Sequence, residues 1–163
     1  MGETLVFIGL GSNLGDRQEH LGRARKALEE LGLKVRMQSA LYLSDPVEVI
    51  DQEEFINQVV GCETGLAPEE VLAVCLAVEK SMGRVRTRDK GPRVIDLDLI
   101  LSGDDIRSGG ALQVPHPRMH LRRFVLEPLA EISPGAWHPV LKRTAAELLS
   151  NCPDRSRVER VLV

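Results

Sequence analysis

The chain contains few aromatic residues and few cysteines. Phe, Tyr and Trp together make up 3% of its 163 residues, and the three cysteines are Cys62, Cys75 and Cys152. So few aromatic side chains argue against a surface that stacks nucleic-acid bases. Three cysteines without C-x-x-C spacing give neither a disulfide framework nor a zinc signature. We therefore expect structural thiols in the reducing cytoplasm.

The chain also lacks a basic overall charge, and its start has no long apolar stretch. The apolar segment from Leu5 to Leu10 has only six residues and no basic leader, which is too short for a membrane span or a signal sequence. The formal net charge is -3, unlike a surface that follows nucleic-acid phosphates. With 43% hydrophobic residues, residues 1–163 are expected to form a single domain. We expect a cytoplasmic protein with no membrane, nucleic-acid or obligate protein partner.

Apolar periodicity alternates between the patterns of strands and helices along the chain. It predicts the order βαββαβ, with strands near 5–10, 34–43, 54–63 and 94–101 and helices at 16–31 and 68–82. This order is typical of a ferredoxin-like α+β core with a mainly antiparallel sheet and helices packed on it. The remaining C-terminal residues are expected to add short elements, including a helix opened by a capping box at Thr144 and Glu147.

A glycine-rich segment follows the first predicted strand. The spacing of Gly9, Gly11 and Gly15 is one residue longer than the G-x-G-x-x-G dinucleotide motif, and no P-loop lysine is present. The segment is better explained as a tight turn in which Ser12 or Asn13 caps the following helix.

Two carboxylates lie close together in the last predicted strand of the core. Asp96 and Asp98 alternate with Leu97 and Leu99 in GPRVIDLDLILSG. In a strand the two aspartates share one face, with Cα atoms roughly 6.5 Å apart. Two unpaired carboxylates on a buried strand would be costly. They are expected either to bind Mg²⁺ or Mn²⁺ together with substrate phosphates, or to lie at a solvated strand end or pair with arginines.

Basic residues flank this strand on both sides. Upstream stand Arg84, Arg86, Arg88, Lys90 and Arg93, and downstream stand His116, Arg118, His120, Arg122 and Arg123. Any one of them taken alone is better explained as a solvated surface charge. Their clustering around two aspartates instead indicates a nucleoside triphosphate site, because arginine and metal together suit phosphoryl oxygens.

Three other residues allow two interpretations each. Glu79 falls on the apolar stripe of the 68–82 helix, where its carboxylate either reaches the surface or serves a partner such as a ligand amine or Arg84. Phe55 and Asn57 share one face of a strand, which suits a flat heterocycle, although Phe55 alone is better explained as core. The same holds for Phe124.

These motifs together resemble one family. FIGLGSNLGDR at 7–17, FIN at 55–57, GRVR at 83–86, GPRVIDLDLIL at 91–101 and VPHPRM with Arg122 and Phe124 occur in the order and spacing of the 6-hydroxymethyl-7,8-dihydropterin pyrophosphokinases. The resemblance extends over about residues 4–132, and GPR-x-x-D-L-D is its most specific part. It implies an ATP-dependent diphosphokinase of folate biosynthesis.

The resemblance also assigns roles to matching residues. It implies that Asp96 and Asp98 bind two Mg²⁺ ions, that ATP is the co-substrate, and that the catalytic set is Asp96, Asp98, Arg84 and Arg93. It implies ATP contacts from Glu79, Arg84, Arg86, Arg93, His116 and Arg122. It implies pterin contacts from Ser44, Asp45, Val47, Phe55, Asn57 and Phe124, with the two phenylalanines on either side of the ring.

The sequence departs from the family pattern at three positions. Lys90 stands where a tryptophan is familiar, Pro117 where a tyrosine is, and Asp45 where a proline is. These changes affect the loop over the active site, one nucleotide contact and the rigidity of the pterin loop.

Two other functional classes remain open from the residues alone. A ferredoxin-like regulatory module would bind a nucleotide without chemistry, but it gives no reason for paired aspartates. A nucleic-acid enzyme would use carboxylates and basic loops, but the net charge of -3 opposes it.

Overall fold

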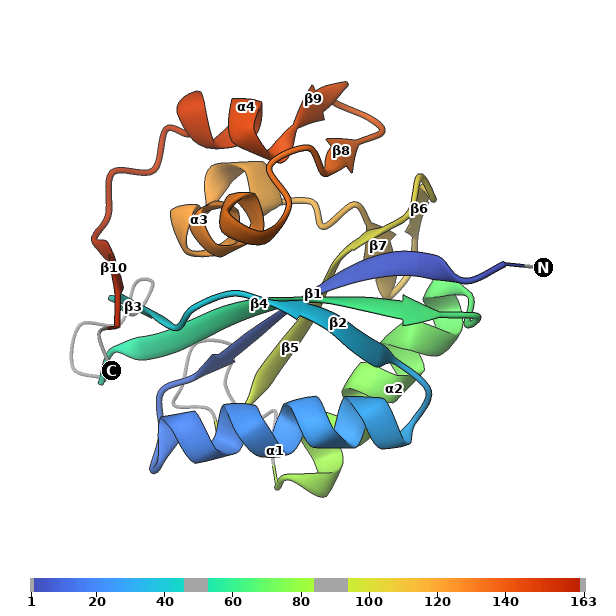
Figure 1. Cartoon of the computed structure of the whole chain (residues 1–163), viewed down its shortest axis with the longest axis vertical. Helices are drawn as coiled ribbons and strands as arrows, with labels where there is room; N and C mark the ends of the chain where they lie inside the picture. The colour runs from blue at the N-terminus through green and yellow to red at the C-terminus, as the bar shows by residue number, and fades with distance from the viewer. Residues whose placement is uncertain (1, 46–52, 84–93, 162–163) are drawn as a thin grey trace.

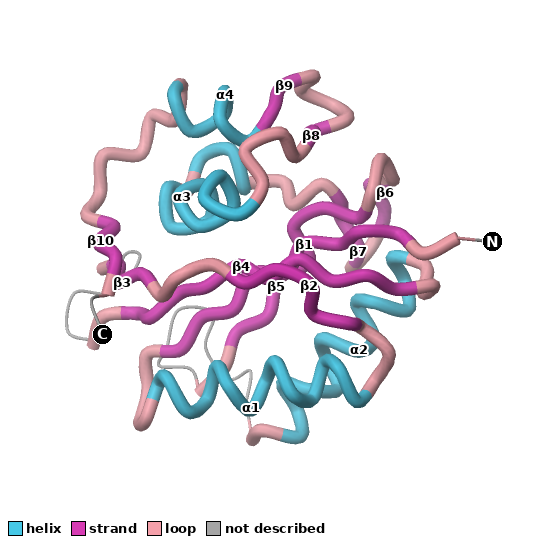
Figure 2. Tube along the Cα trace, in the orientation of Figure 1, coloured by secondary structure: helices cyan, strands magenta, loops and turns pink. Residues whose placement is uncertain are grey.

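The computed structural model describes residues 2–45, 53–83 and 94–161 (Figures 1 and 2). Within these ranges no helix is long and apolar enough to cross a membrane. The elements in chain order are β1 (Thr4–Ser12), α1 (Arg17–Glu30), β2 (Lys34–Gln38), β3 (Tyr42–Ser44), β4 (Phe55–Thr64), α2 (Pro68–Ser81), β5 (Asp96–Ser102), β6 (Arg107–Gly109), β7 (Leu112–Val114), a 3-10 turn η1 (Met119–Leu121), α3 (Arg123–Ile132), β8 (Trp137–His138), β9 (Arg143–Thr144), α4 (Ala145–Ser150) and β10 (Val158–Arg160).

An antiparallel sheet forms the centre of the molecule. Its strands follow the order β10-β3-β4-β1-β5, and β2 also pairs with β4. Both β2 and β3 pair with β4, so they take the place of the second strand of a ferredoxin-like core. The predicted α+β fold with a ferredoxin-like order is confirmed. The pairs β6–β7 and β8–β9 form two separate small sheets.

Helices cover both faces of the sheet, as Figure 1 shows: α1 and α2 lie below it, and α3 and α4 above it. Side chains of β1, β4 and β5 alternate between the two layers, as the period of a strand requires. The lower core includes Ile8, Leu10, Leu28, Ile56, Val71 and Leu97. The upper core includes Phe7, Val59, Ile100, Leu126, Leu129 and Leu148.

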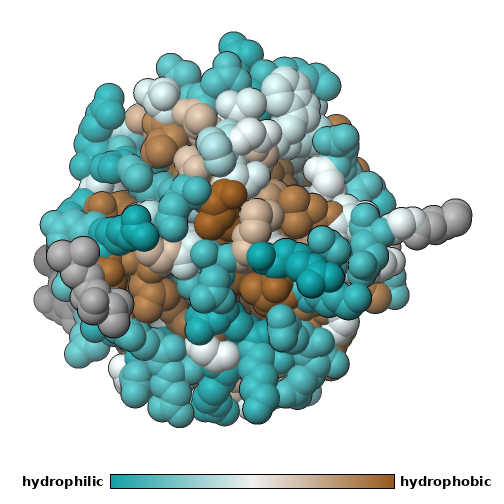
Figure 3. Space-filling view, viewed as in Figure 1, coloured by the Kyte–Doolittle hydropathy of each residue, from teal (hydrophilic) through white to brown (hydrophobic). Residues whose placement is uncertain are grey.

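Hydrophilic residues cover most of the face drawn in Figure 3, over α1 below and over the C-terminal elements above. Apolar residues gather between them, at the level of the sheet. All three cysteines are free and buried, which agrees with the expected structural role of the thiols.

Helix ends follow local sequence signals, with one correction. Asp16 caps α1, because its Oδ1 accepts a hydrogen bond of 3.2 Å from the Glu19 N–H, so the prediction that Ser12 or Asn13 caps this helix is wrong. β1 extends through Ser12, and the turn is made by Gly15, whose φ is +70°. The capping box at Thr144 and Glu147 is confirmed at the start of α4.

The predicted strand at 34–43 is broken between β2 and β3. The Ser39 N–H still donates to the Val59 carbonyl, but the Ser39 Oγ replaces a main-chain acceptor for the Val59 N–H at 3.0 Å. The next N–H, of Ala40, turns away to the Glu131 carboxylate on α3 at 3.1 Å. Side chains therefore take over the pairing at the break, which strand periodicity does not indicate.

Candidate active site

Two glycines on β1 add no side chain of their own to the upper sheet face, and side chains of β4 and β5 lie beside them. Ile8 and Leu10 enter the lower core, so Gly9 and Gly11 face the upper side. Gly11 pairs with Asn57 on β4 and with Asp96 on β5, while Gly9 pairs with Asp98. We call Gly9 and Gly11 the glycine floor. It lies beyond the upper core, which reaches the sheet at Phe7, Val59 and Ile100.

Asp96 and Asp98 border one side of the glycine floor. Leu97 and Leu99 belong to the lower core, so the two aspartates share the upper face, as the alternation predicted. Both are partly exposed, so β5 is not fully buried at this end. Two adjacent, partly exposed carboxylates supply the oxygen ligands that Mg²⁺ prefers. No group of three or more His, Cys, Asp or Glu side chains suited to a metal occurs in the described ranges.

Asn57 and Phe55 border the opposite side of the glycine floor. The buried Asn57 amide donates from Nδ2 to Ser44 Oγ at 2.7 Å and to the Tyr42 carbonyl at 3.3 Å. These bonds fix the amide orientation. A Cβ atom at Gly11 would lie 3.3 Å from Asn57 Oδ1 and 3.5 Å from Phe55 Cδ1.

The register gives the width of the floor. Asn57 and Asp96 pair with Gly11 from opposite sides, so two strand spacings separate them, about 10 Å in all. A flat bicyclic ring with a short substituent has a similar length. The arrangement therefore places hydrogen-bonding and aromatic groups at one side and acidic groups at the other.

Glu79 lies under the aspartate pair. Its side chain is 2% exposed, and its Oε2 accepts a hydrogen bond of 2.8 Å from the Leu97 N–H, between Asp96 and Asp98 in β5. Of the two interpretations offered by the sequence, a surface carboxylate is thus excluded. The partner described here is the main chain of β5.

His116 enters the same region from the segment after β7. Its main-chain N–H donates to the Ile100 carbonyl at 2.9 Å. The Nδ1 atom of its ring accepts a hydrogen bond of 3.1 Å from the main-chain N–H of Arg118. An accepting Nδ1 places the ring proton on Nε2, which can then donate to an anion. Burial, followed by the charge of Arg122, lowers the pKa of His116 to about 4, although Asp96 opposes the shift. His116 is therefore neutral at pH 7.

Arg122 and Phe124 lie together at the start of α3. The Arg122 guanidinium carbon is 5.6 Å from the centre of the Phe124 ring, within the range of a cation–π contact. Phe124 is partly buried and packs against the upper core. Phe55 is also partly buried, but within the described part of the chain it packs against neither core. His120, four residues after His116, takes a different partner, since its ring meets that of His138 edge to face at 6.3 Å.

Several predicted residues fall outside the described ranges, namely Val47, Arg84, Arg86, Lys90 and Arg93. Ser44 is buried and Asp45 is exposed at the end of β3. Sequence reasoning missed Gly11 as a site residue, although glycines two apart on a strand lie on the same face and let neighbouring side chains approach the main chain closely. It also missed Arg157, which contacts Asp45, because nothing in the sequence near Arg157 indicates a partner so far away.

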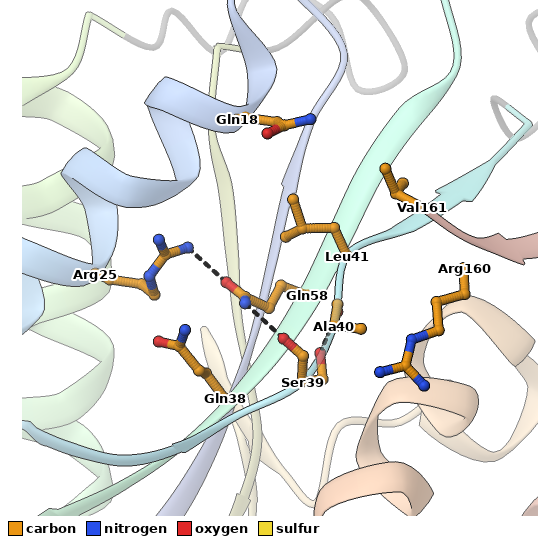
Figure 4. Close-up of a pocket in the computed structure, with 9 residues that line it drawn as sticks. All are labelled: Gln18, Arg25, Gln38, Ser39, Ala40, Leu41, Gln58, Arg160 and Val161. Carbon is orange, nitrogen blue, oxygen red and sulfur yellow. Dashed lines mark hydrogen bonds between the residues drawn. The ribbon is translucent and has the colours of Figure 1, made fainter. Parts of the chain in front are cut away.

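A pocket of about 670 Å³ lies at the β2–β3 break, across the sheet from β5 (Figure 4). Arg25 donates from Nη1 to Gln58 Oε1 at 2.7 Å, and Gln58 Nε2 donates to the Ser39 carbonyl at 2.7 Å. Gln58 points to the lower face, whereas Asn57 points to the upper one. This network satisfies a buried amide and is separate from the glycine floor.

Comparison with known proteins identifies the family. The profile of 7,8-dihydro-6-hydroxymethylpterin-pyrophosphokinase (HPPK) matches residues 7–134. The chain is 41% identical to a 2-amino-4-hydroxy-6-hydroxymethyldihydropteridine pyrophosphokinase of Pseudomonas aeruginosa, covering 91% of each chain. It is 42% identical to the protein of the same name from Bacillus subtilis, covering 79% of this chain and 78% of that one.

Longer relatives contain the same region. The chain is 42% identical to the folic acid synthesis protein fol1 of Pneumocystis carinii over 91% of its own length, but it spans only 20% of that protein. The crystal structure of wild-type Plasmodium falciparum HPPK-DHPS with pteroate superposes with a TM-score of 0.74 at 16% identity, covering 91% of this chain and 42% of that one. The fold is thus shared with these proteins, and the chain belongs to the 7,8-dihydro-6-hydroxymethylpterin-pyrophosphokinase family.

Proposed function

We propose that this chain transfers diphosphate from ATP to 6-hydroxymethyl-7,8-dihydropterin, giving AMP and the pterin diphosphate in folate biosynthesis. It would act in the cytoplasm as one pyrophosphokinase domain over residues 1–163. The observation that carries the proposal is the glycine floor between Asn57 on one side and Asp96 on the other. The names of the bacterial relatives support the same reaction.

The pterin ring would lie over Gly11. Asn57 Oδ1 is suited to accept from the ring edge, because Nδ2 of the same amide already donates to Ser44 and Tyr42. Phe55 and Phe124 would pack on the two faces of the ring. Ser44, Asp45 and Val47 would contact it through the loop that begins at the end of β3. The hydroxymethyl group would then point toward Asp96 and Asp98.

Asp96 and Asp98 would hold Mg²⁺, with two ions expected and Mn²⁺ as a substitute. The fit rests on two partly exposed carboxylates of one strand face, each paired with a glycine of β1. When bound, the ions would neutralise charge on the phosphate oxygens. The aspartates themselves would set where these oxygens lie relative to the hydroxymethyl group.

ATP would be held by groups on the other side of the aspartates. Arg122 supplies a positive charge, and the neutral His116 supplies an Nε2–H donor for a phosphate oxygen or the nucleoside. Arg84, Arg86 and Arg93 would add phosphate contacts. Glu79 would support this site through its bond to the main chain of β5.

The reaction would be an in-line displacement at the β-phosphorus. The hydroxymethyl oxygen forms a bond to the β-phosphorus, the bond from that phosphorus to the bridging α–β oxygen breaks, and AMP leaves with this oxygen. The hydroxyl proton passes to solvent. Within the residues that the structure describes, no side chain stands out as an obligatory base, and a metal-bound Asp98 would be a poor one. Catalysis would come from positioning and from arginines Arg84 and Arg93 on the transferred group.

Product analysis tests the proposal. The chain is mixed with ATP, Mg²⁺ and 6-hydroxymethyl-7,8-dihydropterin, and nucleotides are separated by chromatography. We expect AMP only when both the pterin and Mg²⁺ are present. Formation of ADP, or no product that depends on the pterin, would overturn the proposal in favour of a regulatory module that binds a nucleotide.

A further inference from the structure

The last strand of the chain lies against the part of the sheet that carries the proposed pterin contacts. β10 pairs antiparallel with β3, with Val158 opposite Ser44 and Arg160 opposite Tyr42. This strand lies beyond residues 7–134, which the family profile matches. A segment outside the matched region therefore borders the candidate site.

Arg157, just before β10, contacts acidic residues on both sides of the β3–β4 connection. Its Nη2 donates to Asp45 Oδ1 at 2.9 Å and forms an ion pair with the Glu54 carboxylate. Asp45 directly follows β3, and Glu54 directly precedes β4. Glu159 contributes a third carboxylate, 3.3 Å from Nη1. One guanidinium thus balances three negative charges at the base of this connection.

Each acidic residue adjoins a residue of the candidate site. Asp45 follows Ser44, whose Oγ accepts the 2.7 Å hydrogen bond from Asn57. Glu54 precedes Phe55, which pairs with Ser44 across β3 and β4. A shift of either acidic residue would therefore move the side chains that border the glycine floor.

The chain segment that carries Arg157 is itself tied to α3. Asp154 Oδ2 accepts from the Arg123 N–H at 3.0 Å, and the Ser156 carbonyl accepts from Arg123 Nη1 at 3.1 Å. After β10, the Val161 N–H donates to the Leu41 carbonyl at 2.8 Å. Arg157 therefore approaches Asp45 and Glu54 from a segment anchored on both sides.

We infer that Arg157 is a positioning residue for the pterin: by holding Asp45 and Glu54 together, it keeps Ser44, Phe55 and Asn57 in their binding geometry. The inference rests on the proposed function. Without the guanidinium, the like charges of Asp45 and Glu54 repel each other at the base of the connection. The consequence is weaker pterin binding, whereas the groups proposed to hold ATP lie on other elements.

Steady-state kinetics of Arg157→Gln test this inference, with KM measured for the pterin and for ATP separately. The matched control is Arg155→Gln, because Arg155 is exposed on the same segment and has no hydrogen bond or ion pair with described residues. We expect the pterin KM of Arg157→Gln to rise roughly three- to tenfold, as for a network of partly exposed charges. The ATP KM, the kcat and all constants of Arg155→Gln should stay within about twofold of the parent chain.

A second variant separates positioning from a general loss of folding. Adding Glu54→Gln to Arg157→Gln removes the repulsion, so the double variant should recover most of the pterin affinity. Raising the salt concentration should also reduce the difference between Arg157→Gln and the parent, because these charges are screened.

The outcomes distinguish the two proposals. An inactive parent chain would overturn the proposed function itself. An active parent and control with an unchanged pterin KM in Arg157→Gln would overturn only the positioning role. Equal rises in both KM values, or no recovery in the double variant, would also contradict it, since they indicate a structural effect alone.

Discussion

The carboxylate of Glu79 on α2 accepts a hydrogen bond of 2.8 Å from the main-chain N–H of Leu97 on β5. Among the described strands β5 lies at the edge of the sheet, so none of them pairs with the N–H groups on its outer side. Glu79 supplies an acceptor at this edge, between the two aspartates. The helix thereby fixes the strand segment on which the proposed metal ligands stand.

Glu79→Ala should lower both stability and activity. The buried Leu97 N–H loses its acceptor, and we expect the free energy of unfolding in urea to fall by about 1–3 kcal/mol. The kcat should fall at least roughly tenfold, since the aspartates are displaced. Glu30→Ala, an exposed change on α1, is the control. Full stability together with full kcat in Glu79→Ala would show that this bond positions nothing.

Asp96→Asn and Asp98→Asn should each reduce the rate of AMP formation by roughly 10³-fold or more, because a neutral amide cannot replace a carboxylate ligand. Binding of Mg²⁺ measured by calorimetry, with an ATP analogue present, should weaken in both variants. Asp104→Asn, exposed after the end of β5, should behave as the parent chain. If either site variant keeps its rate at saturating Mg²⁺, that aspartate is no essential ligand.

Gly11→Ala should weaken pterin binding. The added Cβ would lie 3.3 Å from Asn57 Oδ1, so the amide must shift by a few tenths of an ångström, and the floor loses room for the ring. We expect the pterin KM to rise roughly three- to tenfold while the ATP KM is unchanged. Gly22→Ala within α1 should leave both constants alone and stabilise the protein by about 0.5–1 kcal/mol. An unchanged pterin KM in Gly11→Ala would place the ring elsewhere.

The stability of the protein should fall as the pH is lowered from 6.5 to 4, in part because of His116. Its folded pKa is about 4, lowered chiefly by burial, against an ordinary value of 6.5. Between these values the unfolded chain binds a proton that the folded chain does not, so unfolding is favoured as the pH falls. In urea titrations from pH 7 to 4.5, the parent should lose about 1–3 kcal/mol more than His116→Gln. Parallel losses in the two proteins would contradict the lowered pKa.

Features set by neighbouring residues in the chain could be predicted from the sequence. The α1 helix ends before Gly32, and the Thr144 capping box opens α4, because both depend on residues within one helical turn. Asp96 and Asp98 share a face because strand alternation is local as well. The family resemblance added the expected roles of the site residues, and the profile match over residues 7–134 confirms that family.

Features set by contacts between distant residues could not be predicted. The β2–β3 break depends on Ser39 replacing a main-chain partner of Val59. The sequence allowed two interpretations of Glu79, because its hydrogen bond from the Leu97 N–H joins a helix residue and a strand residue that are 18 residues apart in the chain. β10 has only three residues, two of them charged, and its pairing with β3 depends on a strand at the other end of the chain.

That late pairing has a consequence during synthesis. β3 is synthesised early and β10 last among the described strands. The outer edge of Tyr42–Ser44 therefore stays unpaired after the other described strands of the sheet have been synthesised. An open strand edge is a template for pairing with other chains. Aggregation of nascent or C-terminally truncated chains should therefore begin at β3, and β10 is the segment that protects against it.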